Sequence, residues 1–110
     1  MRCTAALLSL LLLAHPAHGQ QADSSGYVPP AGLVPDSATA VRIAVAIWIP
    51  IYGARQISSE RPFVATLKDS VWTVTGSLPP APKGTMIVGG TAIAKILKRD
   101  GRILFVSHYQ

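Results

Sequence analysis

The dipeptide Asp100-Gly101 constrains the fold of this chain more than any other feature. It separates two stretches of alternating apolar residues, 91–99 and 102–109. Asp-Gly is a strong signal for a two-residue type I′ turn, in which both central residues have positive φ. The two stretches are therefore predicted to pair as an antiparallel hairpin. The expected cross-strand pairs are Ile96 with Phe105 and Leu97 with Leu104.

Both faces of this hairpin are apolar in that register. One face would carry Ala92, Ala94, Ile96, Ile103 and Phe105. The other would carry Ile93, Lys95, Leu97, Leu104, Val106 and His108. One helix covers only one face of a sheet, so the second face needs another cover. That cover could be the N-terminal arm, a second copy in a homodimer, a protein partner, or the sheet itself if it bends.

A helix is predicted before the strands. Asp36 can cap it by accepting a hydrogen bond from the first turn, and apolar residues follow at helical spacing. Pro50 has no N–H, so the helix is expected to end or kink near Ile49. Gly53 could close one further turn.

A first hairpin follows the helix, with strands over residues 63–68 and 71–75. Its turn is Asp69-Ser70, although serine adopts positive φ poorly and a longer loop is the alternative. The expected pairs are Leu67 with Trp72 and Ala65 with Val74, on a face that also bears Phe63 and packs on the helix. Residues 77–90 are rich in proline and glycine and suit a long connection. The predicted fold class is α+β, with one main helix on a curved four-stranded antiparallel sheet.

The first 19 residues have the pattern of a cleaved signal peptide. A positive charge at Arg2 precedes an apolar run, and Ala17-His18-Gly19 is a small-x-small cleavage site. The apolar run is shorter than the ~20 residues of a membrane span, so no stable membrane insertion is expected after cleavage. The predicted organisation is a signal peptide over residues 1–19, a flexible tether over 20–31 and a folded domain over 32–110. The protein is expected in the periplasm or outside the cell.

The mature chain offers little for catalysis. Cleavage removes Cys3, the one cysteine, which excludes disulfides and thiolate chemistry. One histidine, His108, and dispersed carboxylates provide neither a paired acid and base nor a metal-ligand set. No enzyme activity, cofactor or metal is predicted. The net charge is +5 for the full chain and +4 for the mature chain, which lacks Arg2. The basic residues lack interleaved aromatics, so nucleic acid is not an expected partner.

An ordered set of short segments resembles the bacterial immunity proteins of the nuclear transport factor 2 fold. The matching segments are Gly32-Leu33-Val34-Pro35-Asp36, Ala46-Ile47-Trp48-Ile49-Pro50-Ile51-Tyr52-Gly53, Arg61-Pro62-Phe63, Val71-Trp72-Thr73-Val74-Thr75-Gly76, Gly89-Gly90-Thr91-Ala92 and Lys98-Arg99-Asp100-Gly101-Arg102-Ile103-Leu104. The resemblance covers residues 32–110 and implies a small α+β fold that neutralises a toxin of interbacterial competition. Three features depart from the pattern: one clear helix, Ser70 in place of a turn glycine, and a basic net charge, which argues against a cationic nuclease as the toxin.

Two functions follow as hypotheses. The first is a non-catalytic protein that binds a toxin through the second face of the hairpin, formed by Ile93, Lys95, Leu97, Leu104, Val106 and His108. The second is a protein that holds a small apolar ligand between helix and sheet, near Trp48, Tyr52 and Trp72. The two tryptophans also fit a plain core role.

Overall fold

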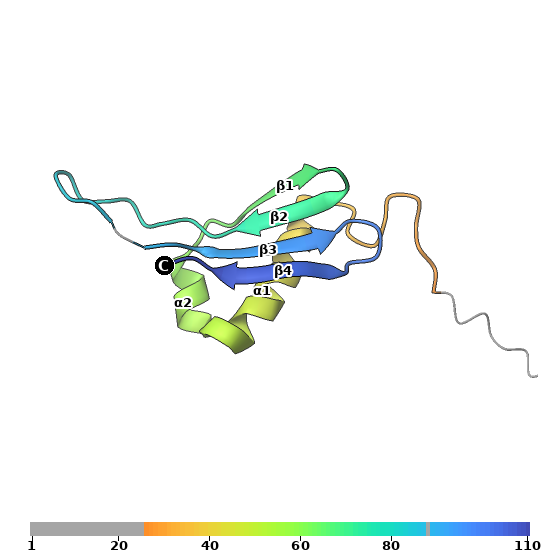
Figure 1. Cartoon of the computed structure of the whole chain (residues 1–110), viewed down its shortest axis with the longest axis horizontal. Helices are drawn as coiled ribbons and strands as arrows, with labels where there is room; N and C mark the ends of the chain where they lie inside the picture. Colours follow the sequence, from red (N-terminus) through yellow and green to blue (C-terminus); the bar gives the residue numbers. More distant parts are fainter. Residues whose placement is uncertain (1–25, 88) are drawn as a thin grey trace, which may run out of the picture.

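The computed structural model describes residues 26–87 and 89–110. Its elements are α1 (Ser37–Tyr52), α2 (Ala54–Ser59), β1 (Val64–Lys68), β2 (Val71–Thr75), β3 (Ala92–Leu97) and β4 (Ile103–His108). The strands form one antiparallel sheet in the order β1-β2-β3-β4, with the helices on one side of it (Figure 1). The predicted α+β class with a four-stranded sheet is therefore confirmed. The predicted signal peptide and the first part of the tether lie outside the described residues.

Helix α1 begins where the sequence predicts and continues past Pro50. The Asp36 carboxylate accepts a hydrogen bond from the Thr39 N–H at 2.8 Å, which is an N-cap. Pro50 does not end the helix, which continues through it to Tyr52 and so contains the further turn that Gly53 was predicted to close. A proline in the last turn removes a single intrahelical hydrogen bond, and the Gly53 N–H still donates to the Ile49 carbonyl at 2.8 Å.

Helix α2 is absent from the sequence prediction. It follows α1 directly after Gly53, whose φ of 94° favours glycine. It spans six residues, and only Ile57 among them is buried. A single buried residue gives no periodic pattern, so the sequence predicts the one main helix and misses this short second one.

The first hairpin has the predicted register. Leu67 lies opposite Trp72 and Ala65 opposite Val74. Asp69 and Ser70 form the two-residue turn, with φ values of 50° and 63°. Trp72 and Val74 are buried under α1, whereas Leu67 at the hairpin end stays 45% exposed.

The second hairpin has a different register from the predicted one. Lys95, not Ile96, lies opposite Phe105. The turn is longer than two residues: the Gly101 N–H donates to the Leu97 carbonyl, and the Leu97 N–H donates to the Arg102 carbonyl. A shift of one residue moves each side chain of a strand to the other face. A bulge beside Lys95 and Ile96 then leaves Leu104 without an opposite residue.

The predicted division of this hairpin into two faces is therefore wrong for β4 from Phe105 onward, whereas Ile103 lies opposite Ile96, on the side predicted for it. Val106 lies opposite Ala94 and packs on the core, on the helix side of the sheet. His108 lies opposite Ala92 on the same side. Phe105 moves to the opposite face, together with Lys95.

The core joins α1 to the first three strands. Its largest fully buried side chains are Trp48, Ile57, Ile96, Val34 and Val74. The indole N–H of Trp48 donates to the Ile93 carbonyl at 3.3 Å, and that of Trp72 donates to the Val34 carbonyl at 2.8 Å. Val34 belongs to the N-terminal arm. The N–H groups of Leu33 and Val34 donate to the carbonyls of Arg99 and Lys98, and these hydrogen bonds hold the arm against the turn of the second hairpin.

Candidate functional site

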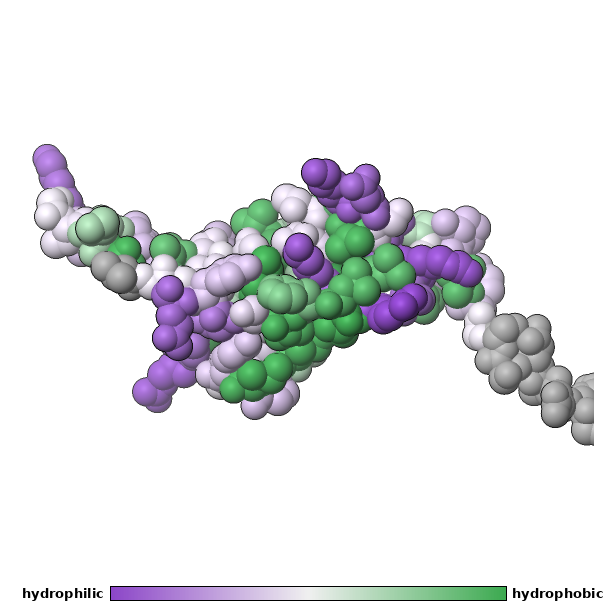
Figure 2. Space-filling model, viewed as in Figure 1, coloured by the Kyte–Doolittle hydropathy of each residue, from purple (hydrophilic) through white to green (hydrophobic). Residues whose placement is uncertain are grey.

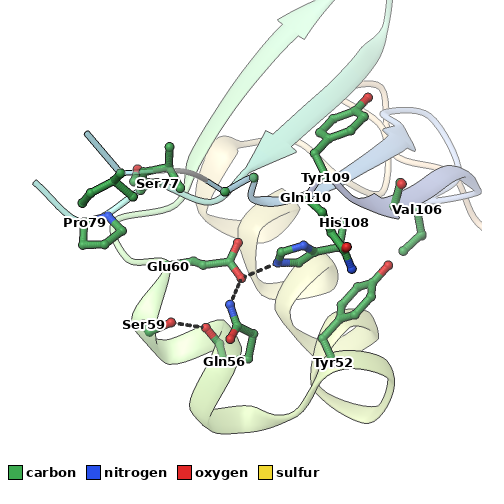
Figure 3. Close-up of a pocket in the computed structure, with 15 residues that line it drawn as sticks. Tyr52, Gln56, Ser59, Glu60, Ser77, Pro79, Val106, His108, Tyr109 and Gln110 are labelled. Atoms are coloured by element: carbon green, nitrogen blue, oxygen red, sulfur yellow. Dashed lines mark hydrogen bonds and ion pairs between the residues drawn. The ribbon is translucent and has the colours of Figure 1, made fainter. Parts of the chain in front are cut away.

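A pocket of about 950 Å³ opens at one end of the sheet (Figure 3). Helix α2, the first residues after β2 and the end of β4 form its walls. Its lining includes Tyr52, Gln56, Glu60, Ser77, His108 and Tyr109. Leu78, Pro79 and Val106 also line it, so polar and apolar side chains are mixed in this pocket. It differs in this from the apolar pocket between helix and sheet that the sequence suggests as an alternative.

Glu60 is the centre of the polar contacts in this pocket. Its side-chain oxygen Oε2 lies 2.9 Å from Nε2 of His108 and accepts a hydrogen bond from the Gln56 amide at 3.1 Å (Figure 3). Its other oxygen, Oε1, accepts from the Ala92 backbone N–H at 2.6 Å. Glu60 is only 3% exposed. The carboxylate therefore joins α2, the start of β3 and the end of β4.

These contacts determine the charge of Glu60. Burial alone would raise the pKa of its carboxyl group, because it disfavours the charged form. The hydrogen bonds from Ala92, His108 and Gln56 outweigh burial and hold the pKa below its ordinary value of 4.5. Glu60 is thus an ionised carboxylate at neutral pH, with its oxygens already occupied by protein donors.

Stability is expected to fall at acid pH partly because of Glu60. A carboxyl whose pKa is lowered by folding stabilises the fold fully above its unfolded pKa, and this contribution is lost as the pH falls through the folded value. Thermal unfolding from about pH 7 to about pH 3 tests this. Glu60→Gln should lose less stability than the natural chain over this pH range. The loss that remains includes the contribution of Asp36, because hydrogen bonds from Thr39 lower the pKa of its carboxyl group. Equal losses in both proteins would contradict this role of Glu60.

Sequence reasoning missed the pair of Glu60 and His108. Glu60 had no predicted role, and His108 was assigned to the partner-binding face. The two residues are 48 positions apart and no motif links them. The predicted register placed His108 on the face away from the helices. The correct register, in which His108 lies opposite Ala92, would have placed it on the helix side and near α2.

A second candidate site is an exposed apolar surface on β4. Helix α1 packs on β1, β2 and β3, which leaves this edge strand largely uncovered. Ile103, Leu104 and Phe105 are each about 40% exposed or more. The amine of Lys95 lies 5.9 Å from the centre of the Phe105 ring. Phe105 and Lys95 lie on the face away from the helices, whereas Ile103 lies opposite Ile96 on the helix side, so these residues meet along the outer edge of β4. We call this edge surface, formed by Ile103, Leu104, Phe105, Lys95 and the neighbouring Arg102, the β4 patch.

The space-filling view shows this apolar character directly. A continuous apolar area covers the β4 side of the domain, and hydrophilic side chains flank it at both ends (Figure 2). Arg102 is 3.6 Å from Asp100 at the hairpin turn, where both side chains are exposed. The patch is thus apolar in its middle and basic at its rim.

The structure brings together only part of the predicted partner-binding set. Lys95 and Leu104 lie in the β4 patch, and Leu97 is half-buried near the hairpin turn. Ile93 is only 9% exposed. Val106 and His108 lie on the helix side, Val106 on the core and His108 on Glu60. Ile103 and Phe105 were assigned to the covered face, so the sequence missed their exposure.

The residues of the alternative apolar pocket are also separated. Trp48 and Trp72 are buried in the core, at 0% and 7% exposure, and neither lines the pocket around Glu60. Tyr52 does line the pocket around Glu60, and its ring centre lies 5.2 Å from that of His108.

Two further observations concern the described residues. None of their helices is long and apolar enough to cross a membrane. They also contain no group of three or more histidine, cysteine, aspartate or glutamate side chains that could hold a metal ion.

Comparison with known proteins gives one match. Residues 39–110 fit the model of a protein family described as NTF2 fold immunity protein. This segment includes α1 from its third residue onward, all of α2, all four strands and both candidate sites. No curated protein and no solved structure matches the chain.

Proposed function

Because this chain belongs to the NTF2 fold immunity protein family, we propose that it is an exported, non-catalytic protein that binds and neutralises a toxin of interbacterial competition. Family membership supports a role in toxin immunity. The basic net charge of +5 favours a toxin with an acidic binding surface and argues against a cationic nuclease. Nucleic acid and a membrane are not the proposed partners.

The observation that carries toxin binding is the β4 patch. Leu104 and Phe105 are exposed large apolar side chains on an edge strand, at 46% and 42%. Protein interfaces combine an apolar centre with a polar rim and favour aromatic and arginine residues. The β4 patch has this composition, with Lys95 and Arg102 at its rim.

Export rests on the N-terminal sequence. Residues 1–19 have the charge, apolar run and cleavage site of a signal peptide. In this proposal residues 20–31 tether the immunity domain, residues 32–110, in the periplasm or outside the cell. A toxin that acts on the cell wall or membrane would meet the protein there.

A small apolar ligand has less support as an alternative. The pocket beside Tyr52 holds an ionised carboxylate, Glu60, and several hydroxyl and amide groups. Buried charge next to an apolar ligand is unfavourable. The two tryptophans expected to hold such a ligand belong to the core.

Capture of the toxin tests the proposed function. Tagged protein lacking residues 1–19 would be the bait in secreted and envelope extracts of the native strain, with mass spectrometry as the readout. A neutralising complex of standard interface size often binds at about nanomolar Kd, so a cognate toxin should survive washing. The purified partner should be toxic alone and harmless with the bait. A folded bait that retains no toxin, from extracts in which toxins are detected, would contradict the proposal.

A further inference from the structure

The connection between β2 and β3 projects away from the rest of the domain. Residues 77–87 extend from the end of the sheet as a long loop (Figure 1). Adjacent antiparallel strands need only a two-residue turn, so this length serves no purpose in pairing β2 with β3. Loops of this kind are uncommon in compact domains, and those that are not linkers or disordered segments usually carry function. Met86, which is 85% exposed, is its most exposed large apolar side chain.

The loop has a defined shape. At its tip, the Thr85 N–H donates to the Pro82 carbonyl at 3.0 Å, and Gly84 has the positive φ of 82° that such a turn needs. At its base, the Ser77 N–H donates to the Glu60 carbonyl at 2.7 Å. Three prolines, Pro79, Pro80 and Pro82, restrict the backbone between base and tip. A loop restricted in this way loses little conformational entropy when it binds.

The chemistry of the loop suits a concave partner with negative charge. Met86 is an adaptable apolar side chain, and Lys83 is the one charged residue among residues 77–87. A projecting segment needs a hollow to fill, and the large clefts of enzymes are usually their substrate sites. The described part of the N-terminal arm, residues 26–35, lies at the opposite end of the domain from this loop (Figure 1).

We infer that residues 77–87 enter the substrate cleft of the toxin, with Met86 on an apolar wall and Lys83 beside carboxylates. This inference rests on the proposed function, since it names the part of the protein that blocks the toxin. The loop and the exposed end of the β4 patch lie at opposite ends of the sheet, which makes their contributions separable (Figure 1).

Photocrosslinking in the native strain tests the inference and does not require that the toxin be identified first. Benzoylphenylalanine would replace Met86 in one variant, Leu104 in a second and Tyr27 in a third. Tyr27 is a matched control, because it is 79% exposed and lies on the N-terminal arm. We expect position 86 to crosslink to a secreted toxin, at a peptide that borders its substrate cleft, and position 27 to give no such product.

Inhibition provides the second measurement. Met86→Asp should weaken inhibition of the crosslinked toxin at least ~10-fold, whereas Tyr27→Asp should leave it unchanged. Both variants should keep the circular dichroism spectrum of the natural chain, since both side chains are exposed. Crosslinking through position 104 but not 86, with full inhibition by Met86→Asp, would overturn the inference and leave the proposed function intact. Crosslinking at neither position, together with failure of the natural chain to protect cells, would overturn both.

Discussion

Replacing Glu60 with alanine is expected to lower the free energy of unfolding by about 2–3 kcal/mol, because it removes a buried carboxylate that accepts three hydrogen bonds. The Glu60 carboxylate accepts hydrogen bonds from the Ala92 N–H, from Gln56 and from His108. Alanine would leave the Ala92 N–H without its partner at the start of β3. A buried donor without an acceptor costs the full desolvation of that group.

Urea unfolding, followed by the fluorescence of the two buried tryptophans, measures this effect. His108→Ala is the matched comparison, because it removes the other member of the Glu60–His108 pair. Its side chain is 19% exposed against 4% for Glu60, and its loss leaves the bond to Ala92 intact, so its cost should be smaller. Equal costs for the two variants, or a cost below about 1 kcal/mol for Glu60→Ala, would show that water replaces the carboxylate.

Turn chemistry explains both the success and the failure of register prediction. Asp69-Ser70 lacks glycine, yet it forms the predicted two-residue turn and the register of the first hairpin follows. Asp100-Gly101 has the stronger local signal, yet its glycine serves in a longer turn, with the Gly101 N–H bonded to Leu97. The N-terminal arm also binds this turn, through the Lys98 and Arg99 carbonyls. That contact comes from distant residues, so a local pattern does not contain it.

The fold class could be predicted from less of the sequence than the candidate site. Four alternating stretches and one capped helix suffice to predict four antiparallel strands and a helix, and these are present. The candidate site depends on which face each β4 residue occupies, and a shift of one residue reverses that assignment. Glu60 and His108 meet only because α2 and the last residues of β4 converge. Such a contact follows from tertiary packing and has no signature in either segment alone.

The β4 patch supplies the second large effect: Leu104→Asp is expected to weaken toxin binding about 100-fold or more. Truncating a central interface residue often costs about 2 kcal/mol or more, and a buried unpaired carboxylate adds a further penalty. The fold should tolerate the change. Leu104 has no opposite residue at the bulge and is 46% exposed, so the new carboxylate would remain in water in the free protein.

Leu67→Asp is the matched control for this prediction. Leu67 is also a leucine in an edge strand, at 45% exposure, but it lies on β1 at the other side of the sheet. The two variants therefore share the change in charge, the loss of apolar area and a place on an edge strand. Binding measured by titration calorimetry should fall for Leu104→Asp alone. Equal affinity for both variants would place the toxin elsewhere on the domain, and unfolding of Leu104→Asp alone would mean that the β4 patch is part of the core.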